Sequence, residues 1–189
     1  MTIEIFRKKQ KPLLNITALV FAFIWLGIML GSLSTLRNVP YIGFPITLAL
    51  FLSVWICDTA AFGFGMKFGT RKILPEVSPK KTWVGCFSGL ISSVIFMMMM
   101  YRFNYFTFHV SHLDAIILGI IAGFFGQLGD FSESLLKREA NIKDTSNILR
   151  GHGGILDRVD SLTYTAPLFF HFVYWSSDFH TFGAGIIGQ

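Results

Sequence analysis

The chain has 189 residues, of which 52% are hydrophobic and only 14% are charged. Soluble domains carry about 25% charged residues, so the composition excludes an ordinary soluble domain, a disordered chain and a disulfide-rich secreted module. The net charge of +5 does not indicate nucleic acid, because the positive residues flank long apolar runs. We therefore expect an all-α, polytopic integral membrane protein.

Two apolar runs open the chain. Residues 13–36 contain no charged side chain and follow a basic N-terminal segment. This run is too long for the apolar core of a signal peptide, and about 20 apolar residues suffice to cross a bilayer. The second run covers residues 41–57 and stops at Asp58. An unpaired carboxylate in a membrane is costly, so Asp58 is expected either to line a polar cavity or to cap a helix.

Three more spans are predicted, which makes about five transmembrane helices. The third covers residues 83–101 and the fifth covers residues 161–175. The fourth apolar run, residues 115–128, is short, but apart from Gly129 nothing breaks a helix before Ala140. A helix over residues 114–140 would be about 40 Å long. It would cross the bilayer and project beyond it.

The distribution of positive charge predicts the orientation. Fourteen of the 16 Lys and Arg residues lie in the N-terminal segment, the connection after the second run and the connection after the fourth run. Arg37 and Arg102 are the other two. Positive residues favour the cytoplasmic side of a membrane, so the N-terminus and both basic loops are expected there. The whole chain, residues 1–189, is predicted to form one membrane-embedded domain, whose chemistry is indicated by the motifs that follow.

A polar stripe marks the end of the predicted fourth helix. Asp130, Glu133, Ser134 and Lys137 are spaced at i, i+3, i+4 and i+7, which puts them on one helix face. Two carboxylates, a hydroxyl and an ammonium on one stripe can bind a metal ion and phosphate. A charged helix face is also common at the solvated end of an amphipathic helix, and the spacing leaves both interpretations open.

A glycine-rich segment follows the stripe. Residues 151–154 read Gly-His-Gly-Gly and lead to Asp157, Arg158 and Asp160. Glycine lets backbone N–H groups approach an anion closely. Carboxylates beside such a loop suit Mg²⁺, whose remaining ligands can be phosphate oxygens. This pattern favours a site for a metal ion and a phosphorylated substrate.

These residues resemble the signature of phosphatidate cytidylyltransferases, also called CDP-diacylglycerol synthases. The likeness rests on Ser-Leu-Leu-Lys-Arg at residues 134–138, Lys-Asp at 143–144, and Gly-His-Gly-Gly-Ile-Leu-Asp-Arg-Val-Asp at 151–160. Residues 78–83 and 57–62 resemble two further blocks of that family. Together the motifs extend over residues 58–160. The chain is short for the family, and it is expected to lack N-terminal membrane helices that family members carry.

The resemblance implies transfer of a cytidylyl group from CTP to phosphatidate, giving CDP-diacylglycerol and pyrophosphate for phospholipid biosynthesis. It assigns Mg²⁺ to Asp130 and Asp157, with a second monovalent or divalent cation left open. The catalytic residues are expected to be Asp130, Ser134, Lys137 and Asp157. Substrate-binding residues are expected to be Lys80, Lys81, Arg138, Lys143, His152, Gly153, Gly154 and Arg158. Glu133 and Asp160 are expected behind them, as supporting or structural groups.

The expected partners are CTP, phosphatidate and the lipid bilayer, with a homodimer left open and nucleic acid excluded. The expected location is the cell inner membrane, as a multi-pass protein. A truncated inactive remnant or a non-catalytic membrane subunit of the same family is the alternative. A CDP-alcohol phosphatidyltransferase is disfavoured because the D-G-x-x-A-R motif of that class is absent. A transporter is disfavoured because the sequence has no paired inverted halves.

Overall fold

The computed structural model of the chain describes residues 12–106, 110–142, 145, 154 and 156–176, without the side chains of Pro12 and Arg158. Within these residues the regular elements are helices, joined by turns and by one β-bridge between Lys72 and Thr82. The all-α prediction is confirmed for this part of the chain.

Two long rods each contain a short π-helical segment. The first rod combines α2 (Pro12–Ala22), η1 (Phe23–Met29) and α3 (Leu30–Arg37). The second rod combines α6 (His112–Ile120), η2 (Ile121–Phe125) and α7 (Gly126–Glu139). The other helices are α4 (Gly43–Phe68), α5 (Trp83–Arg102) and α8 (Leu156–Trp175).

Four helices among the described residues are long and apolar enough to cross a membrane. They are Leu13–Arg37, Gly43–Phe68, Trp83–Arg102 and His112–Glu139, and they correspond to the first four predicted spans. The last of them confirms a continuous helix through Gly129. The predicted fifth span is the C-terminal part of α8, which is helical but is not among the four. Its first turn is acidic, and Pro167 lies inside it.

The second predicted span is longer than the apolar run that marks it. Helix α4 continues ten residues past Asp58 and ends at Phe68. The interpretation of Asp58 as a helix cap is therefore wrong, because Asp58 lies inside the helix. The alternative, that Asp58 lines a polar cavity, is confirmed below.

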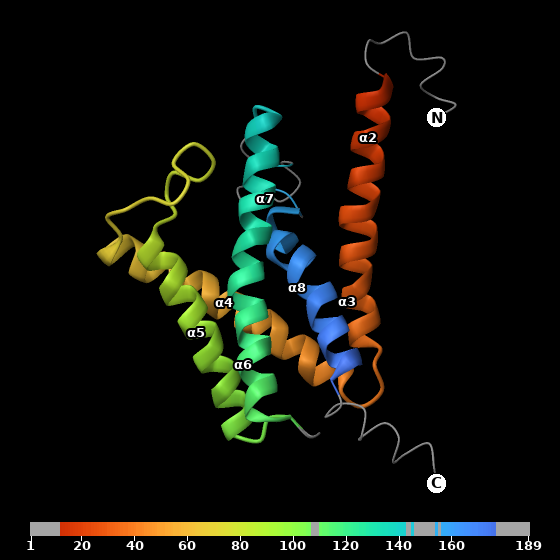
Figure 1. The fold of residues 1–189 in the computed structure, drawn as a ribbon, viewed down its shortest axis with the longest axis vertical. Helices are drawn as coiled ribbons and strands as arrows, with labels where there is room; N and C mark the ends of the chain where they lie inside the picture. The colour runs from red at the N-terminus through yellow and green to blue at the C-terminus, as the bar shows by residue number, and fades with distance from the viewer. Residues whose placement is uncertain (1–11, 107–109, 143–144, 146–153, 155, 177–189) are drawn as a thin grey trace.

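The α6–α7 rod stands at the centre of the arrangement (Figure 1). Helices α4 and α5 pack against each other, and α8 lies between α7 and α3. The start of α2, the α4–α5 connection and the end of α7 all point to the upper end in this view. The predicted topology puts these basic segments on one side of the membrane, and the fold is consistent with that grouping.

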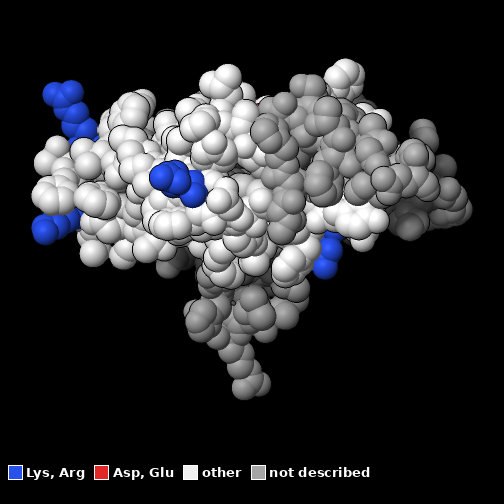
Figure 2. Space-filling model, turned by 90° about the horizontal axis from the view of Figure 1, so that it is seen from below, with Lys and Arg blue, Asp and Glu red and all other residues white. Residues whose placement is uncertain are grey.

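The opposite end carries the α3–α4 and α5–α6 connections. Figure 2 shows this end, where basic side chains are sparse and no acidic side chain is visible among the atoms that are not grey. This end is the one that the count of Lys and Arg along the sequence predicts to be poor in positive charge.

Glycines allow the helices to approach closely. A Cβ atom added at Gly85 of α5 would lie 2.6 Å from the Ala61 carbonyl oxygen of α4, and one added at Gly89 would lie 2.9 Å from the Cys57 carbonyl oxygen. A Cβ atom at Gly129 of α7 would overlap the carbonyl oxygen of Asp160. Small residues at helix contacts are typical of membrane proteins. The Gly129 contact also fixes where α8 meets the polar end of α7.

Candidate active site

The predicted polar stripe on α7 exists and is held by one hydrogen bond and one ion pair. The Ser134 hydroxyl donates to Asp130 Oδ1 at 3.3 Å, and Lys137 Nζ lies 3.4 Å from Glu133 Oε2. Both pairs are four residues apart, which is the spacing at which helical side chains meet. The stripe is buried or half-buried rather than solvated. It therefore faces other elements of the fold, which argues against a purely solvent-exposed helix end.

Asp157 joins α7, α8 and the segment between them. Its Oδ1 accepts from Lys137 Nζ at 2.7 Å, and its Oδ2 accepts from the Thr145 backbone N–H at 3.1 Å, the Thr145 hydroxyl at 2.9 Å and the Gly154 N–H at 2.6 Å. Burial alone would raise the pKa of Asp157, but these donors, led by Lys137, hold it well below its ordinary value. Asp157 is therefore a carboxylate that stays deprotonated at neutral pH.

Asp130 is paired with a different lysine. Lys81, in the connection between α4 and α5, contacts Asp130 Oδ2 with its ammonium group. The same ammonium lies 4.2 Å from the centre of the Phe131 ring, where it gains a cation–π interaction. Each of the two predicted metal ligands thus has its own lysine. Their sharing of one metal ion stays a prediction.

Helices α4 and α8 add two more carboxylates. Asp58, Asp157 and Asp160 line a cavity of about 140 Å³ together with Trp55 and neighbouring residues. The Ser161 backbone N–H donates to Asp160 Oδ1 at 2.6 Å. Acidic side chains from α4, α7 and α8 therefore gather at one end of the helix bundle.

The buried Glu133 gives a test of whether these residues suit a metal ion. Glu133 is 1% exposed, and neither carboxylate oxygen accepts a hydrogen bond from the residues that the structure describes. The Asp157 and Asp160 carboxylates adjoin it. Added positive charge stabilises crowded, partly desolvated carboxylates, and carboxylate oxygens are the ligands that Mg²⁺ prefers. The donor set therefore fits Mg²⁺.

The carboxylates are not arranged as a complete metal cage. Among the described residues, no group of three Asp, Glu, His or Cys side chains could hold a metal ion by itself. Mg²⁺ usually takes one or two carboxylates and completes its shell with water and substrate phosphates. A Mg²⁺ ion held here would therefore need water or substrate oxygens in addition to the carboxylates.

The other predicted substrate-binding residues fall into three groups. Arg138 is exposed and its Nε donates to the Val77 carbonyl oxygen at 3.3 Å, while Lys80 is exposed in the α4–α5 connection. The Gly154 N–H is directed at Asp157. Lys143, His152, Gly153 and the side chain of Arg158 lie outside the described residues.

Thr145 is a site contact that the sequence did not single out. It sits outside every quoted motif, and its contact with Asp157 joins two residues that are 12 positions apart in the sequence. Asp58 carried a usable signal, since a single acid within an apolar stretch indicates a polar neighbour. Its neighbours, Asp157 and Asp160, come from α8 and could not be identified by spacing along the chain.

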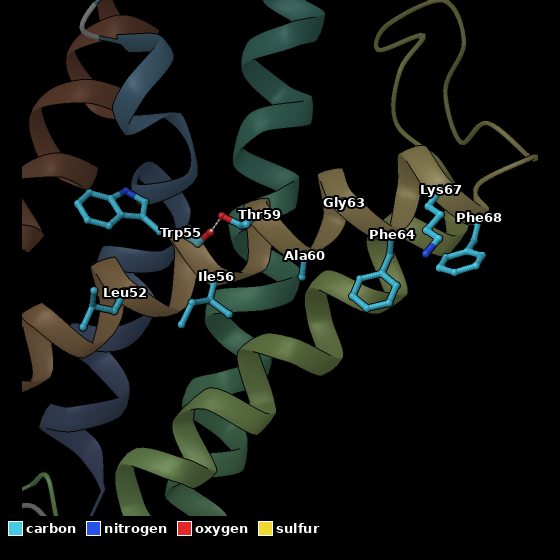
Figure 3. Close-up of a pocket in the computed structure, with 9 residues that line it drawn as sticks. All are labelled: Leu52, Trp55, Ile56, Thr59, Ala60, Gly63, Phe64, Lys67 and Phe68. Atoms are coloured by element: carbon cyan, nitrogen blue, oxygen red, sulfur yellow. Dashed lines mark hydrogen bonds between the residues drawn. The ribbon is translucent and has the colours of Figure 1, made fainter.

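An apolar groove runs along α4 next to the acidic cavity. It has a volume of about 700 Å³. Figure 3 shows its lining residues on α4: Leu52, Trp55, Ile56, Thr59, Ala60, Gly63, Phe64, Lys67 and Phe68. Trp55 lines both this groove and the acidic cavity. An apolar surface and a cluster of charges thus meet at one side chain.

The fold and the site define a polytopic helical membrane protein whose carboxylates and lysines converge at one end of its spans. The chain matches the Cytidylyltransferase family over residues 1–176, and it belongs to that family. The family predicted from the motifs is therefore confirmed.

Curated relatives carry the name phosphatidate cytidylyltransferase. The chain is 37% identical over 173 residues to the one from Haemophilus influenzae, covering 88% of this chain and 59% of that protein. It is 38% and 41% identical over 147 residues to those from Staphylococcus epidermidis and Staphylococcus aureus, covering 78% of this chain and 54% of each relative. The chain thus spans little more than half the length of these relatives.

Proposed function

We propose that this chain carries the catalytic part of a phosphatidate cytidylyltransferase. The reaction transfers a cytidylyl group from CTP to phosphatidate and yields CDP-diacylglycerol and pyrophosphate. The observation that supports this most directly is the pair of lysine–aspartate contacts, Lys81 with Asp130 and Lys137 with Asp157, at the polar end of a membrane-spanning rod. Family membership and the names of the relatives support the same reaction.

The chemistry requires neutralisation and positioning more than a strong base. A phosphate oxygen of the lipid forms a bond to the α-phosphorus of CTP, and the bond from that phosphorus to the oxygen bridging to the β-phosphate breaks. The attacking oxygen is already anionic, so the main obstacles are repulsion between phosphates and the charge on leaving pyrophosphate. Enzymes of phosphoryl transfer meet these obstacles with cations and positioning.

The residues of the site have distinct proposed roles. Asp130 and Asp157 would hold Mg²⁺, which when bound supplies positive charge to the phosphate oxygens; a second cation is left open. Ser134 and Lys137 lie beside these two aspartates and would contact the reacting phosphates. The remaining phosphate and nucleotide contacts are assigned to Lys80, Lys81, Arg138, Lys143, His152, Gly153, Gly154 and Arg158.

The groove along α4 supports a lipid as the second substrate. Trp55 borders both the groove and the acidic cavity. Acyl chains in the groove would keep the lipid phosphate beside the charged residues without exposing the chains to water. We also propose that the protein resides in the cell inner membrane with its basic loops in the cytoplasm. A homodimer is the oligomeric hypothesis.

The test is synthesis of CDP-lipid by the purified full chain in lipid nanodiscs. Phosphatidate, Mg²⁺ and labelled CTP should give labelled CDP-diacylglycerol on thin-layer chromatography, whereas labelled ATP should give no corresponding product. Asp130→Asn and Asp157→Asn should each lower turnover at least about 100-fold, and Asp144→Asn should have a milder effect. Equal product from ATP would contradict the cytidine assignment. A folded chain that makes no product would support the non-catalytic alternative.

A further inference from the structure

One lysine of the connection between α4 and α5, Lys81, lies in the acidic site. Lys81 touches Asp130 and lies over the Phe131 ring, and its side chain is 24% exposed. Lys80, its neighbour in the chain, is exposed. Two adjacent lysines that look equivalent in the sequence therefore have different positions, and Lys81 is the one held against α7.

The backbone of the connection fixes this position. The Ile73 N–H donates to the Lys81 carbonyl oxygen at 3.2 Å, and the Trp83 N–H donates to the Arg71 carbonyl oxygen at 3.1 Å. These bonds close residues 71–83 into a loop whose two ends lie side by side. The ammonium of Lys81 is therefore presented by a closed loop and not by a free strand of chain.

The same loop touches α7 at a second point. Arg138 Nε donates to the Val77 carbonyl oxygen at 3.3 Å. Asp130 and Arg138 are eight residues apart on α7, which is about 12 Å along a helix. The loop is therefore held against α7 by one contact to a proposed metal ligand and one contact near the helix end.

The charges around Lys81 are mostly negative. Asp130 of α7 contacts the Lys81 ammonium directly, and Asp58 of α4 interacts with it electrostatically. Asp160 of α8 interacts electrostatically with both of these carboxylates. Ion pairs of this partly desolvated kind are stronger than surface pairs. A divalent cation carries twice the charge of an ammonium group and prefers the same carboxylate oxygens.

We propose that Lys81 is a displaceable counter-cation of Asp130. The ammonium and a divalent metal ion compete for one carboxylate, so that metal binding releases Lys81 from α7 and loosens the loop. The released ammonium becomes available to phosphate at the moment when the metal ion is in place. This inference rests on the proposed function in one respect, which is that Asp130 binds the metal ion.

Metal affinity without substrate provides the test. Mn²⁺ binding to the full chain in nanodiscs of neutral phosphatidylcholine can be followed by electron paramagnetic resonance. Removal of the competitor in Lys81→Gln should tighten Mn²⁺ binding by about fivefold or more, in the range usual for coupled sites. Lys80→Gln and Lys72→Gln, in the same loop, should bind Mn²⁺ as the unmodified chain does. Unchanged or weaker binding in Lys81→Gln would overturn the proposal.

Asp130→Asn separates this inference from the proposed function. It should weaken Mn²⁺ binding at least about fivefold. If it does so while Lys81→Gln leaves the affinity unchanged, the counter-cation role fails and the metal assignment stands. If Asp130→Asn binds Mn²⁺ normally, both the counter-cation role and the metal assignment fail.

Limited trypsin digestion gives a readout of the loop itself. Mn²⁺ should speed cleavage after Arg71 and Lys72 in the unmodified chain, with the products identified by mass spectrometry. Lys81→Gln should be cleaved fast with or without Mn²⁺, whereas Lys81→Arg, which keeps the positive charge, should retain the response to Mn²⁺. Cleavage of the unmodified chain that does not respond to Mn²⁺ would contradict release of the loop. Thermal unfolding curves identify variants that fail to fold.

Discussion

Lys137 Nζ lies 2.7 Å from Asp157 Oδ1 and thereby joins the end of α7 to the start of α8. The lysine also lies 3.4 Å from Glu133, so one ammonium group serves two carboxylates from two helices. All three side chains are at most 16% exposed. The contact therefore links the geometry of the proposed site to the stability of the fold.

Loss of the Lys137 ammonium should destabilise the chain. Lys137→Met leaves Asp157 and Glu133 without their common cation. Breaking a buried ion pair in this way lowers the free energy of unfolding by about 3–5 kcal/mol. The Lys137 and Asp157 side chains are 16% and 13% exposed, which places the expected loss near the lower value. Thermal unfolding in detergent should show a clear drop in melting temperature. Lys72→Met, at an exposed position, should melt like the unmodified chain. A Lys137→Met variant with an unchanged melting temperature would contradict the role given to this pair.

Neutralising Glu133 should have the opposite effect on stability. Glu133→Gln replaces a buried carboxyl group beside the Asp157 and Asp160 carboxylates with an amide, which can donate a hydrogen bond to one of them without carrying charge. The melting temperature should rise by a few degrees, since ~1 kcal/mol corresponds to roughly 2–4 °C for a chain of this size. Glu139→Gln, exposed on the same helix, is the matched control. A strong loss of stability would show that Glu133 is required as a charged group.

Adding one methyl group at Gly129 should disturb the site through the backbone. In Gly129→Ala the new Cβ overlaps the Asp160 carbonyl oxygen, so α8 must move away from α7. Both the melting temperature and CDP-lipid synthesis should fall. Gly31→Ala introduces the same group where no atom lies within 4 Å and should be neutral or slightly stabilising, because alanine favours a helix by up to about 1 kcal/mol over glycine. Equal behaviour of the two variants would contradict the close α7–α8 contact.

Single cysteines can test the orientation in the membrane. Cysteine at Lys9, Lys72 or Asn141 should react with a membrane-impermeant maleimide only from the cytoplasmic side. Cysteine at Asn38 or Asn104 should react only from the opposite side. The expectation follows from the excess of Lys and Arg in the three predicted cytoplasmic segments.

The labelling requires a background without the native thiols. Cys57 is buried and Cys86 is half-buried, so alanine at both positions gives a chain with no competing cysteine. Labelling of Lys72→Cys and Asn104→Cys from the same side would disprove the topology.

The sequence allowed the helices to be predicted well where hydropathy is the dominant force. The helix expected over residues 114–140 is observed as His112–Glu139, because a single glycine does not break a helix that is held by packing on both sides. The end of α4 was missed, since an acidic residue ends an apolar run in the sequence. In the structure Asp58 faces a cavity that α8 helps to form, so the helix can continue past it.

The sequence predicted which side chains share the face of α7, whereas the contacts made by the loop lysines could not be predicted from it. The stripe on α7 follows from a fixed spacing of residues, and the hydrogen bond from Ser134 to Asp130 and the ion pair between Lys137 and Glu133 confirm that these side chains share one face. The choice of Lys81 over Lys80 depends on how residues 71–83 close into a loop. That closure is made by backbone hydrogen bonds, which do not depend on the identities of the side chains that it presents.

The length of the α6–α7 rod has a consequence for the surrounding bilayer. Twenty-eight helical residues extend for about 42 Å, whereas the hydrocarbon core is about 30 Å thick. Asp130 lies 18 residues from the start of the rod, or about 27 Å along it. With the start of the rod at one boundary of the hydrocarbon core, the other boundary would fall on the charged stripe. Thickening or thinning the bilayer by a few Å, as happens between lipids of different acyl length, would then shift the carboxylates between a polar and an apolar medium without any change in the protein.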